Sequence, residues 1–350
     1  DIDFGQSGLL DNVTIPTGFK FLNQDNMAEN TAGITGFSWI KNRDAADNHI
    51  LQDRVRGVYQ YLPLYSSSDV AESTDTNSVQ RFLQQGVQIG NMDAVNTSAE
   101  SFVLWQWVAN GTGTANTDGT GIDSTVSANT TAGFSVVKYE GSGTAGNTVG
   151  HGLGAIPHFI IVKNYSSTGP GWYVYHQALG ATKYIRLEGN SAAQTSSDSW
   201  NDGSPVFSTT TFTVGGGGSY INDSGDDHIA YCWTETEGYS KFGSYTGNGN
   251  ADGAFVYLGF RPAFILIKGT SASRSWRIFD NKRLGYNRAN DTLVANGNAA
   301  ETTDAELDIT AGGFKLRSSA QDVGEEEVHI YAAFAENPFG GSGVAQARAR

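Results

Sequence analysis

Residues 153–163 read Leu-Gly-Ala-Ile-Pro-His-Phe-Ile-Ile-Val-Lys, and residues 258–268 repeat them as Leu-Gly-Phe-Arg-Pro-Ala-Phe-Ile-Leu-Ile-Lys. Leu, Gly, Pro, Phe, Ile and the closing Lys hold the same places in both copies. A shorter copy, Phe-Ser-Trp-Ile-Lys, stands at residues 37–41. Because an internal sequence repeat indicates a repeated structure, these copies predict that the chain is built from similar structural units.

Each copy is followed, after a long interval, by a second shared run that is rich in aromatic and small apolar residues. The closing lysines Lys41, Lys163 and Lys268 are 122 and 105 residues apart. Units of this size are typical of domains, so we expect each one to bury its own core. The closing runs are Phe-Val-Leu-Trp-Gln-Trp at 102–107, His-Ile-Ala-Tyr-Cys-Trp at 228–233 and His-Ile-Tyr-Ala-Ala-Phe at 329–334.

The composition favours short strands joined by many turns. Glycine supplies 44 of 350 residues, and the repeated runs are β-branched or aromatic and bounded by Gly, Asn, Asp or Ser. Long amphipathic helical patterns are missing. The sequence therefore predicts an all-β fold, a tandem array of three homologous antiparallel β-sandwich-like modules.

The predicted modules are joined by unlike material. A Gly/Thr/Asn-rich stretch with few apolar residues follows the first module and predicts a linker. The expected boundaries are the end of an upstream domain with a lead-in at 1–33, a first, degenerate module at 34–111, the linker at 112–132, a second module at 133–238, a third at 239–339 and a flexible tail at 340–350.

The net charge of −14 argues against nucleic-acid binding, because phosphates would be repelled. No apolar run is long enough to span a membrane, so we expect no membrane insertion. The single cysteine, Cys232, excludes a disulfide framework within the chain, and its apolar surroundings predict a buried, unreactive thiol.

No group of residues stands out as a catalytic or metal site, and we expect no catalytic residues, metal or cofactor. His228 and His329 hold matching repeat positions, which favours a structural role. His176 aligns with Asp280 and Asp53, and this change of residue type predicts a surface position. Paired carboxylates for glycoside cleavage can meet only in the folded chain, so the sequence does not single two out.

Two aromatic residues in loops have no counterpart in the other copies. Trp200 lies in a polar loop, and Tyr220 interrupts a glycine-rich loop. Flat apolar rings framed by Asn and Asp are natural platforms for sugars, so both are candidate ligand-binding residues. The alternative is that each loop packs its ring against its own module. Tryptophans inside the repeated runs are assigned to cores.

Several strings along the chain resemble repeat modules of tail-fibre and related virion proteins of tailed, especially marine, bacteriophages. This resemblance implies a structural or adhesive role and supplies no catalytic residue. The strings are Gly-Phe-Ser-Trp-Ile-Lys-Asn-Arg-Asp at 36–44, Asp-Arg-Val-Arg-Gly at 53–57, Trp-Gln-Trp-Val-Ala-Asn-Gly at 105–111, Asn-Thr-Thr-Ala-Gly-Phe-Ser at 129–135, Lys-Phe-Gly-Ser-Tyr-Thr-Gly-Asn-Gly at 241–249 and Ile-Tyr-Ala-Ala-Phe-Ala-Glu-Asn-Pro-Phe at 330–339.

We therefore expect a virion protein on the particle surface, most simply a tail-fibre segment that presents loops to the host. Its expected partners are further copies of itself, as a homotrimer by analogy with fibres, other virion proteins and a host surface glycan. A capsid decoration or cement protein is the alternative. A depolymerase acting on surface polysaccharide is a third hypothesis, which requires facing carboxylates in a groove.

Overall fold

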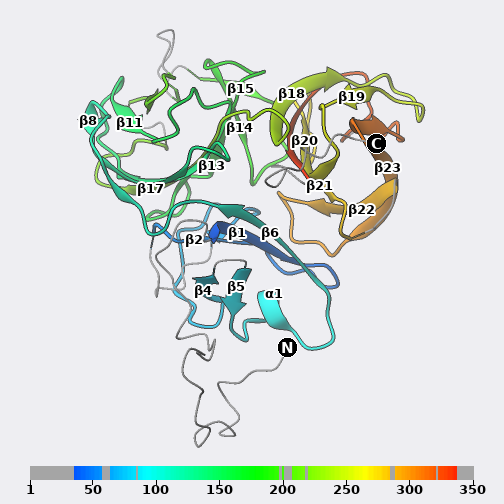
Figure 1. The fold of residues 1–350 in the computed structure, drawn as a ribbon, viewed down its shortest axis with the longest axis horizontal. Helices are drawn as coiled ribbons and strands as arrows, with labels where there is room; N and C mark the ends of the chain where they lie inside the picture. Colours follow the sequence, from blue (N-terminus) through cyan, green and yellow to red (C-terminus); the bar gives the residue numbers. More distant parts are fainter. Residues whose placement is uncertain are drawn as a thin grey trace, which may run out of the picture.

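The computed structural model describes eight stretches of the chain and is all-β, as the sequence predicts (Figure 1). One short helix, α1 (Asp93–Asn96), occurs in the described part, and no helix there has the length and apolar character needed to cross a bilayer. The described residues are 35–56, 64–83, 86–196, 199–200, 207–216, 220–283, 288–320 and 322–336.

The first sheet has four strands in the order β3-β2-β1-β6. Along each strand, side chains that point toward the centre of the molecule alternate with side chains that point away from it, because successive side chains of a strand lie on opposite faces of the sheet. A two-stranded hairpin, β4 and β5, packs with α1 against the outward face, around Ile40 and Ile50. The bounds are β1 (Thr35–Asn42), β2 (Ile50–Asp53), β3 (Leu64–Tyr65), β4 (Val79–Leu83), β5 (Gly86–Ile89) and β6 (Phe102–Val108).

The second sheet has eight strands in the order β15-β14-β13-β12-β17-β10-β9-β7, and a three-stranded sheet, β16-β11-β8, accompanies it. The bounds are β7 (Thr114–Asn116), β8 (Gly121–Ile122), β9 (Ser124–Asn129), β10 (Phe134–Glu140), β11 (Thr148–Gly150), β12 (Phe159–Asn164), β13 (Trp172–His176), β14 (Lys183–Arg186), β15 (Gln194–Thr195), β16 (Thr211–Thr213) and β17 (Asp227–Trp233).

The third sheet also has eight strands, in the order β18-β25-β20-β21-β22-β23-β24-β19. The bounds are β18 (Ser240–Thr246), β19 (Phe255–Tyr257), β20 (Pro262–Gly269), β21 (Arg277–Asp280), β22 (Arg288–Val294), β23 (Thr302–Thr310), β24 (Gly313–Leu316) and β25 (Val328–Ala335).

The three sheets share a pair of adjacent strands that has the same order and the same pairing register in each sheet. The repeated runs form β1, β12 and β20, and the closing runs form their neighbours β6, β17 and β25. Positions that the register matches between sheets are called equivalent below. The defining pairs are Phe37 with Trp107, Phe159 with Trp233 and Phe264 with Phe334.

The inward faces of the three sheets meet in one hydrophobic core. Figure 1 shows the first sheet (blue to cyan), the second (green) and the third (yellow to red) around this centre. The equivalent rings of Trp107, Trp233 and Phe334 contact one another there, with centroid separations of 5.9, 5.5 and 6.3 Å. The expectation that each unit buries a separate core is therefore wrong for the inward faces; only the outward faces have cores of their own.

Polar contacts between neighbouring sheets repeat in a closed cycle. Trp172 Nε1 donates to the carbonyl of Tyr65 at the end of β3 (2.9 Å), and Trp276 Nε1 donates to that of Arg186 at the end of β14 (2.8 Å). The equivalent His49 contacts the carbonyl of Val294 at the end of β22 through Nε2 (3.1 Å). The second sheet thus bonds to the first, the third to the second, and the first to the third.

Two of the three closing lysines of the repeated runs take part in the same junctions. Lys163 Nζ donates to the carbonyl of Asp69 in the first unit (3.0 Å), and Lys268 Nζ to that of Asn190 in the second (2.9 Å). Lys41 donates to carbonyls of its own loop. Burial lowers the pKa of each lysine to about 8, because an ammonium group loses hydration on leaving water. These lysines are structural donors.

The stretch at 112–132 is not a linker. It forms β7, β8 and β9, and β9 pairs with β10 along six consecutive residues. The strand escaped sequence analysis because its buried positions are mostly small or hydroxylated, including Ser124 and Ser127 beside Val126. Residues 1–33 and 340–350, which were assigned to an upstream domain and a tail, lie outside the described residues.

Candidate binding groove

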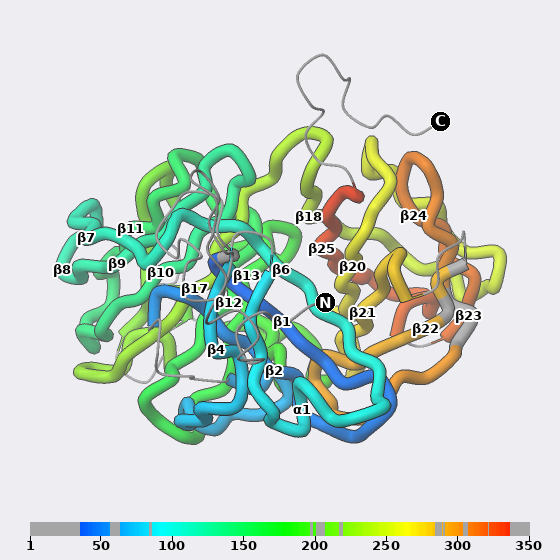
Figure 2. The backbone as a smooth tube through the Cα atoms, turned by 60° about the horizontal axis from the view of Figure 1, so that its bottom comes forward, coloured from blue at the N-terminus to red at the C-terminus, as the bar shows by residue number. Residues whose placement is uncertain are grey.

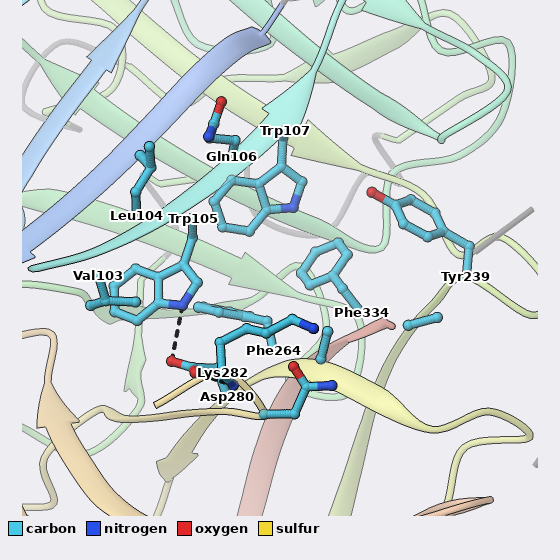
Figure 3. Close-up of a pocket in the computed structure, with 13 residues that line it drawn as sticks. Val103, Leu104, Trp105, Gln106, Trp107, Tyr239, Phe264, Asp280, Lys282 and Phe334 are labelled. Atoms are coloured by element: carbon cyan, nitrogen blue, oxygen red, sulfur yellow. Dashed lines mark hydrogen bonds between the residues drawn. The ribbon is translucent and has the colours of Figure 1, made fainter. Parts of the chain in front are cut away.

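A groove of about 330 Å³ runs between β6 of the first sheet and the ends of β20, β21 and β25 of the third (Figure 3). Trp105 and Trp107 of β6 form one wall. Phe264 and Phe334 of the third sheet form the other, with Tyr239 at one end. The groove lies at the outer margin of the shared core, where the first and third sheets meet.

The aromatic rings of the groove hold one another in edge-to-face contacts. Trp105 and Phe264 lie 5.4 Å apart at 74°, and Trp107 lies 5.5 Å from both Phe264 and Phe334 at 85° and 73°. Such contacts add to the stabilisation that apolar burial already provides. The groove is therefore lined by aromatic rings that are held in place by contacts with one another.

The polar side of the groove is built around the buried carboxylate of Asp280. Trp105 Nε1 donates to Oδ2 (3.2 Å), and the backbone N–H groups of Lys282 and Arg283 donate to Oδ1 (2.9 and 3.0 Å). Arg283 Nε also donates to Oδ2 (2.6 Å). The carboxylate is thus occupied by its own chain, and it joins the third sheet to the first.

Asp280, Asp53 and His176 are equivalent, and all three are buried at sheet junctions. Asp53 accepts from Tyr231 of the second sheet (2.9 Å), and His176 Nε2 contacts the carbonyl of Tyr331 in the third (3.0 Å). The predicted surface position is therefore wrong. The residue type differs between copies because each residue must match a different partner on the neighbouring sheet.

Asn281 is a buried polar residue of the groove that sequence reasoning missed. Its side chain is 5% exposed, and neither Nδ2 nor Oδ1 has a hydrogen-bond partner among the described residues. A buried amide without partners is costly, so native structures rarely leave one. The signal available in the sequence was its alignment with Gln177, directly after the aligned pair Asp280 and His176.

The sequence model of one family, described as a domain of unknown function (DUF7483), matches residues 23–338. The chain belongs to this family. No curated protein and no solved structure matches the chain.

Neither of the two loop aromatics predicted to bind ligand lies in the groove of this DUF7483 chain. Trp200 is fully buried in the outer core of the second sheet, with its ring 5.8 Å from Tyr175 and 6.0 Å from Phe207. Its ring therefore packs against its own unit. Tyr220 is 44% exposed, has a positive φ of 51° and lies 5.8 Å from the ring of Tyr173. Tyr220 keeps an exposed ring surface.

The histidines of the DUF7483 chain serve in its packing. His228 and His329 stack on Tyr139 and Tyr245, with centroid separations of 5.1 and 5.0 Å. Burial lowers the pKa of His228 to about 4. Within the described ranges, no group of three or more His, Cys, Asp or Glu side chains is placed to hold a metal ion. Cys232 is buried, which raises the pKa of its thiol.

Proposed function

We propose that this DUF7483 chain is a structural protein of a tailed-bacteriophage particle, and more specifically a tail-fibre segment that presents loops for attachment to the host surface. The observation that supports a structural role is the closed cycle of contacts between sheets. A second cycle runs through the buried side chains of Asp53, His176 and Asp280, each of which bonds to a neighbouring sheet. The resemblance of several strings to virion repeat modules supports the choice of particle.

Three homologous modules, derived from one ancestral unit, are part of the same proposal. The shared strand order and register support it, as does a repeated Asp-x-x-Arg corner. Arg56 Nε donates to Asp53 Oδ2 (2.5 Å) in the first unit, and Arg283 Nε donates to Asp280 Oδ2 in the third. The second unit has Leu179 in place of the arginine, as His176 replaces the aspartate.

Attachment in this proposal comes from many weak contacts multiplied by copies of the chain in a homotrimer. Exposed loop aromatics such as Tyr220 would contact a host surface glycan. A capsid decoration protein is the alternative, in which the same rigid body binds neighbouring shell subunits.

The proposal predicts where the chain lies on the virus. Antibodies raised against the purified chain, applied to particles of the phage that encodes it, should place gold label at the distal end of the tail. Label spread over the capsid would favour the decoration protein. Particles that remain unlabelled, while an antibody against the major capsid protein labels them, would contradict both forms of the proposal.

A further inference from the structure

The groove has two counterparts in the fold, and each of them is filled by a phenylalanine ring. In the second sheet, the ring centroid of Phe134 from β10 lies 5.0 Å from that of Trp233 and 6.4 Å from that of Phe37. These two residues are the equivalents of Trp107 and Phe264, which stand on opposite walls of the groove. The groove therefore corresponds in position to an aromatic ring of the second sheet.

The third sheet is filled in the same way. The ring of Phe242 from β18 lies 5.7 Å from Phe334 and 5.6 Å from Phe159, which are again the equivalents of Trp107 and Phe264. At the junction between β6 and the third sheet, none of the described residues fills the corresponding position, and the groove lies there instead.

Asn281 indicates what else the occupant of the groove should carry. Its equivalent, Gln177, donates from Nε2 to the main-chain carbonyl of Phe242, the residue whose ring fills the third sheet's position. The backbone N–H groups of Asn281 and Gln177 make matching bonds, to Ala263 (3.1 Å) and His158 (2.9 Å). The buried, unpartnered amide of Asn281 is thus placed to bond the main-chain carbonyl of a residue whose ring lies in the groove.

The described surface offers one phenylalanine of this kind, Phe255 in β19. Its side chain is 52% exposed, and among the described residues it is the only phenylalanine in the exposed class. On either side of it, main-chain bonds join Ala254 to Leu316 (3.0 Å) and Leu258 to Gly312 (2.8 Å), along β24. Because the bonds of an antiparallel ladder alternate, the carbonyl of Phe255 points away from β24, toward the outer edge of the sheet.

We propose that the groove is the acceptor for Phe255 of a second copy of this chain. The ring of Phe255 would lie between Trp107 and Phe264, and Asn281 would donate to the main-chain carbonyl of the same residue, as its equivalent does in the third sheet. The contact uses the side-chain walls of the groove and requires no main-chain bond to β6.

The two surfaces lie on different sides of the third sheet, so Phe255 cannot reach the groove of its own copy. Figure 2 shows β24, the neighbour of β19, at the outer margin of this sheet, with β20 and β21 between it and β6. A protruding ring and a groove at separate places on one molecule give a heterologous contact, which can close into a ring of copies. The number of copies, three, rests on the proposed function, whereas the contact itself does not.

The exposed charges beside the two surfaces are opposite in sign. Lys282 at the groove pairs with Glu336 (3.6 Å) and keeps 75% of its side chain exposed. Asp252, three residues before Phe255, pairs with Lys315 (2.8 Å) and keeps 80% exposed. Contact between the two unlike surfaces brings these opposite charges together, whereas contact between two grooves or between two β19 strands would bring like charges together.

Substitutions on either surface should separate the copies. Phe255→Ala removes the inserted ring, and Ala263→Phe fills the groove, so sedimentation equilibrium should show that each variant associates at least tenfold more weakly than the parent. Asn281→Leu is a second groove variant, which replaces an unpartnered amide with an apolar group of similar size and should fold as the parent does. Tyr220→Ala removes an exposed ring elsewhere and is the matched control, with unchanged association.

An equimolar mixture of two variants tests whether the contact joins unlike surfaces. Phe255→Ala keeps an intact groove, and Ala263→Phe keeps an intact Phe255, so the mixture should form a 1:1 dimer although neither variant associates alone. Association of Ala263→Phe and Asn281→Leu alone would overturn the proposal in favour of two β19 strands that meet each other. Association of Phe255→Ala alone would overturn it in favour of another occupant of the groove.

The same measurements separate this contact from the proposed function. A parent trimer that survives both Phe255→Ala and Asn281→Leu would overturn the contact and leave the homotrimer standing. A parent chain that stays monomeric would overturn the contact and the homotrimer together, while the position of the gold label on the particle would still test the structural role.

Discussion

Replacement of Asp53 by alanine is expected to lower the free energy of unfolding by about 3 kcal/mol. The carboxylate and the guanidinium of Arg56 form an ion pair whose side chains are 0% and 1% exposed. Removing one partner of a buried pair leaves the other charge unpaired, which costs about 3–5 kcal/mol. Glu72 also contacts Arg56 (3.0 Å), so the lower end of this range is expected. Urea denaturation followed by tryptophan fluorescence measures the loss.

Two matched variants separate the charge effect from the contact between sheets. Tyr231→Phe removes only the hydrogen bond to Asp53 and should cost about 1 kcal/mol. Adding Arg56→Met to Asp53→Ala removes both charges and should recover most of the loss. A double variant as unstable as Asp53→Ala alone would show that the unpaired charge of Arg56 is not the cause.

Stability should fall steeply as the pH is lowered from about 6.5 to 4. Burial is the main cause that lowers the pKa of His49 to about 3 and the pKa values of His151, His176 and His228 to about 4. In this window the unfolded chain binds protons at these histidines and the folded chain does not. Each such group costs up to about 1.4 kcal/mol per pH unit, so four together can exceed a typical domain's net stability.

The pH dependence can be assigned with single variants. The urea midpoints measured at pH 7, 6 and 5 should differ less from one another in His176→Gln than in the parent. Glutamine can still donate to the carbonyl of Tyr331 but does not titrate. His158 is only half-buried, and burial lowers its pKa as well. His158→Gln should flatten the dependence less. A flat stability profile between pH 7 and 5 in the parent would contradict this account.

The sequence predicted the class of fold because that class depends on local patterns, namely β-branched and aromatic runs bounded by turn residues. The repeated runs became the central strands, and the tryptophans within them are buried, as expected. Local pattern does not record how units pack on one another. Asp53, His176 and Asp280 were placed on the surface because their differences have meaning only beside partners such as Tyr231, more than 170 residues away in the chain from Asp53.

The candidate site was missed for the same reason. The groove joins β6 to residues that follow it by about 130 to 230 positions, and no motif links Trp107 to Phe264 or Asn281 in the sequence. Trp200 illustrates the reverse case. Its polar neighbours suggested an exposed platform, whereas its ring lies in a core formed with Tyr175 and Phe207, which come from other segments.

The central claim is that three sheets fold as one body around a shared core, and calorimetry of the intact chain tests it most directly. Differential scanning calorimetry of the parent and of Asp53→Ala should each give one transition whose calorimetric and van't Hoff enthalpies agree. The variant's whole transition should move to lower temperature, because Asp53 joins the first sheet to the second. Two or three resolved transitions, of which the substitution moves only one, would contradict the account.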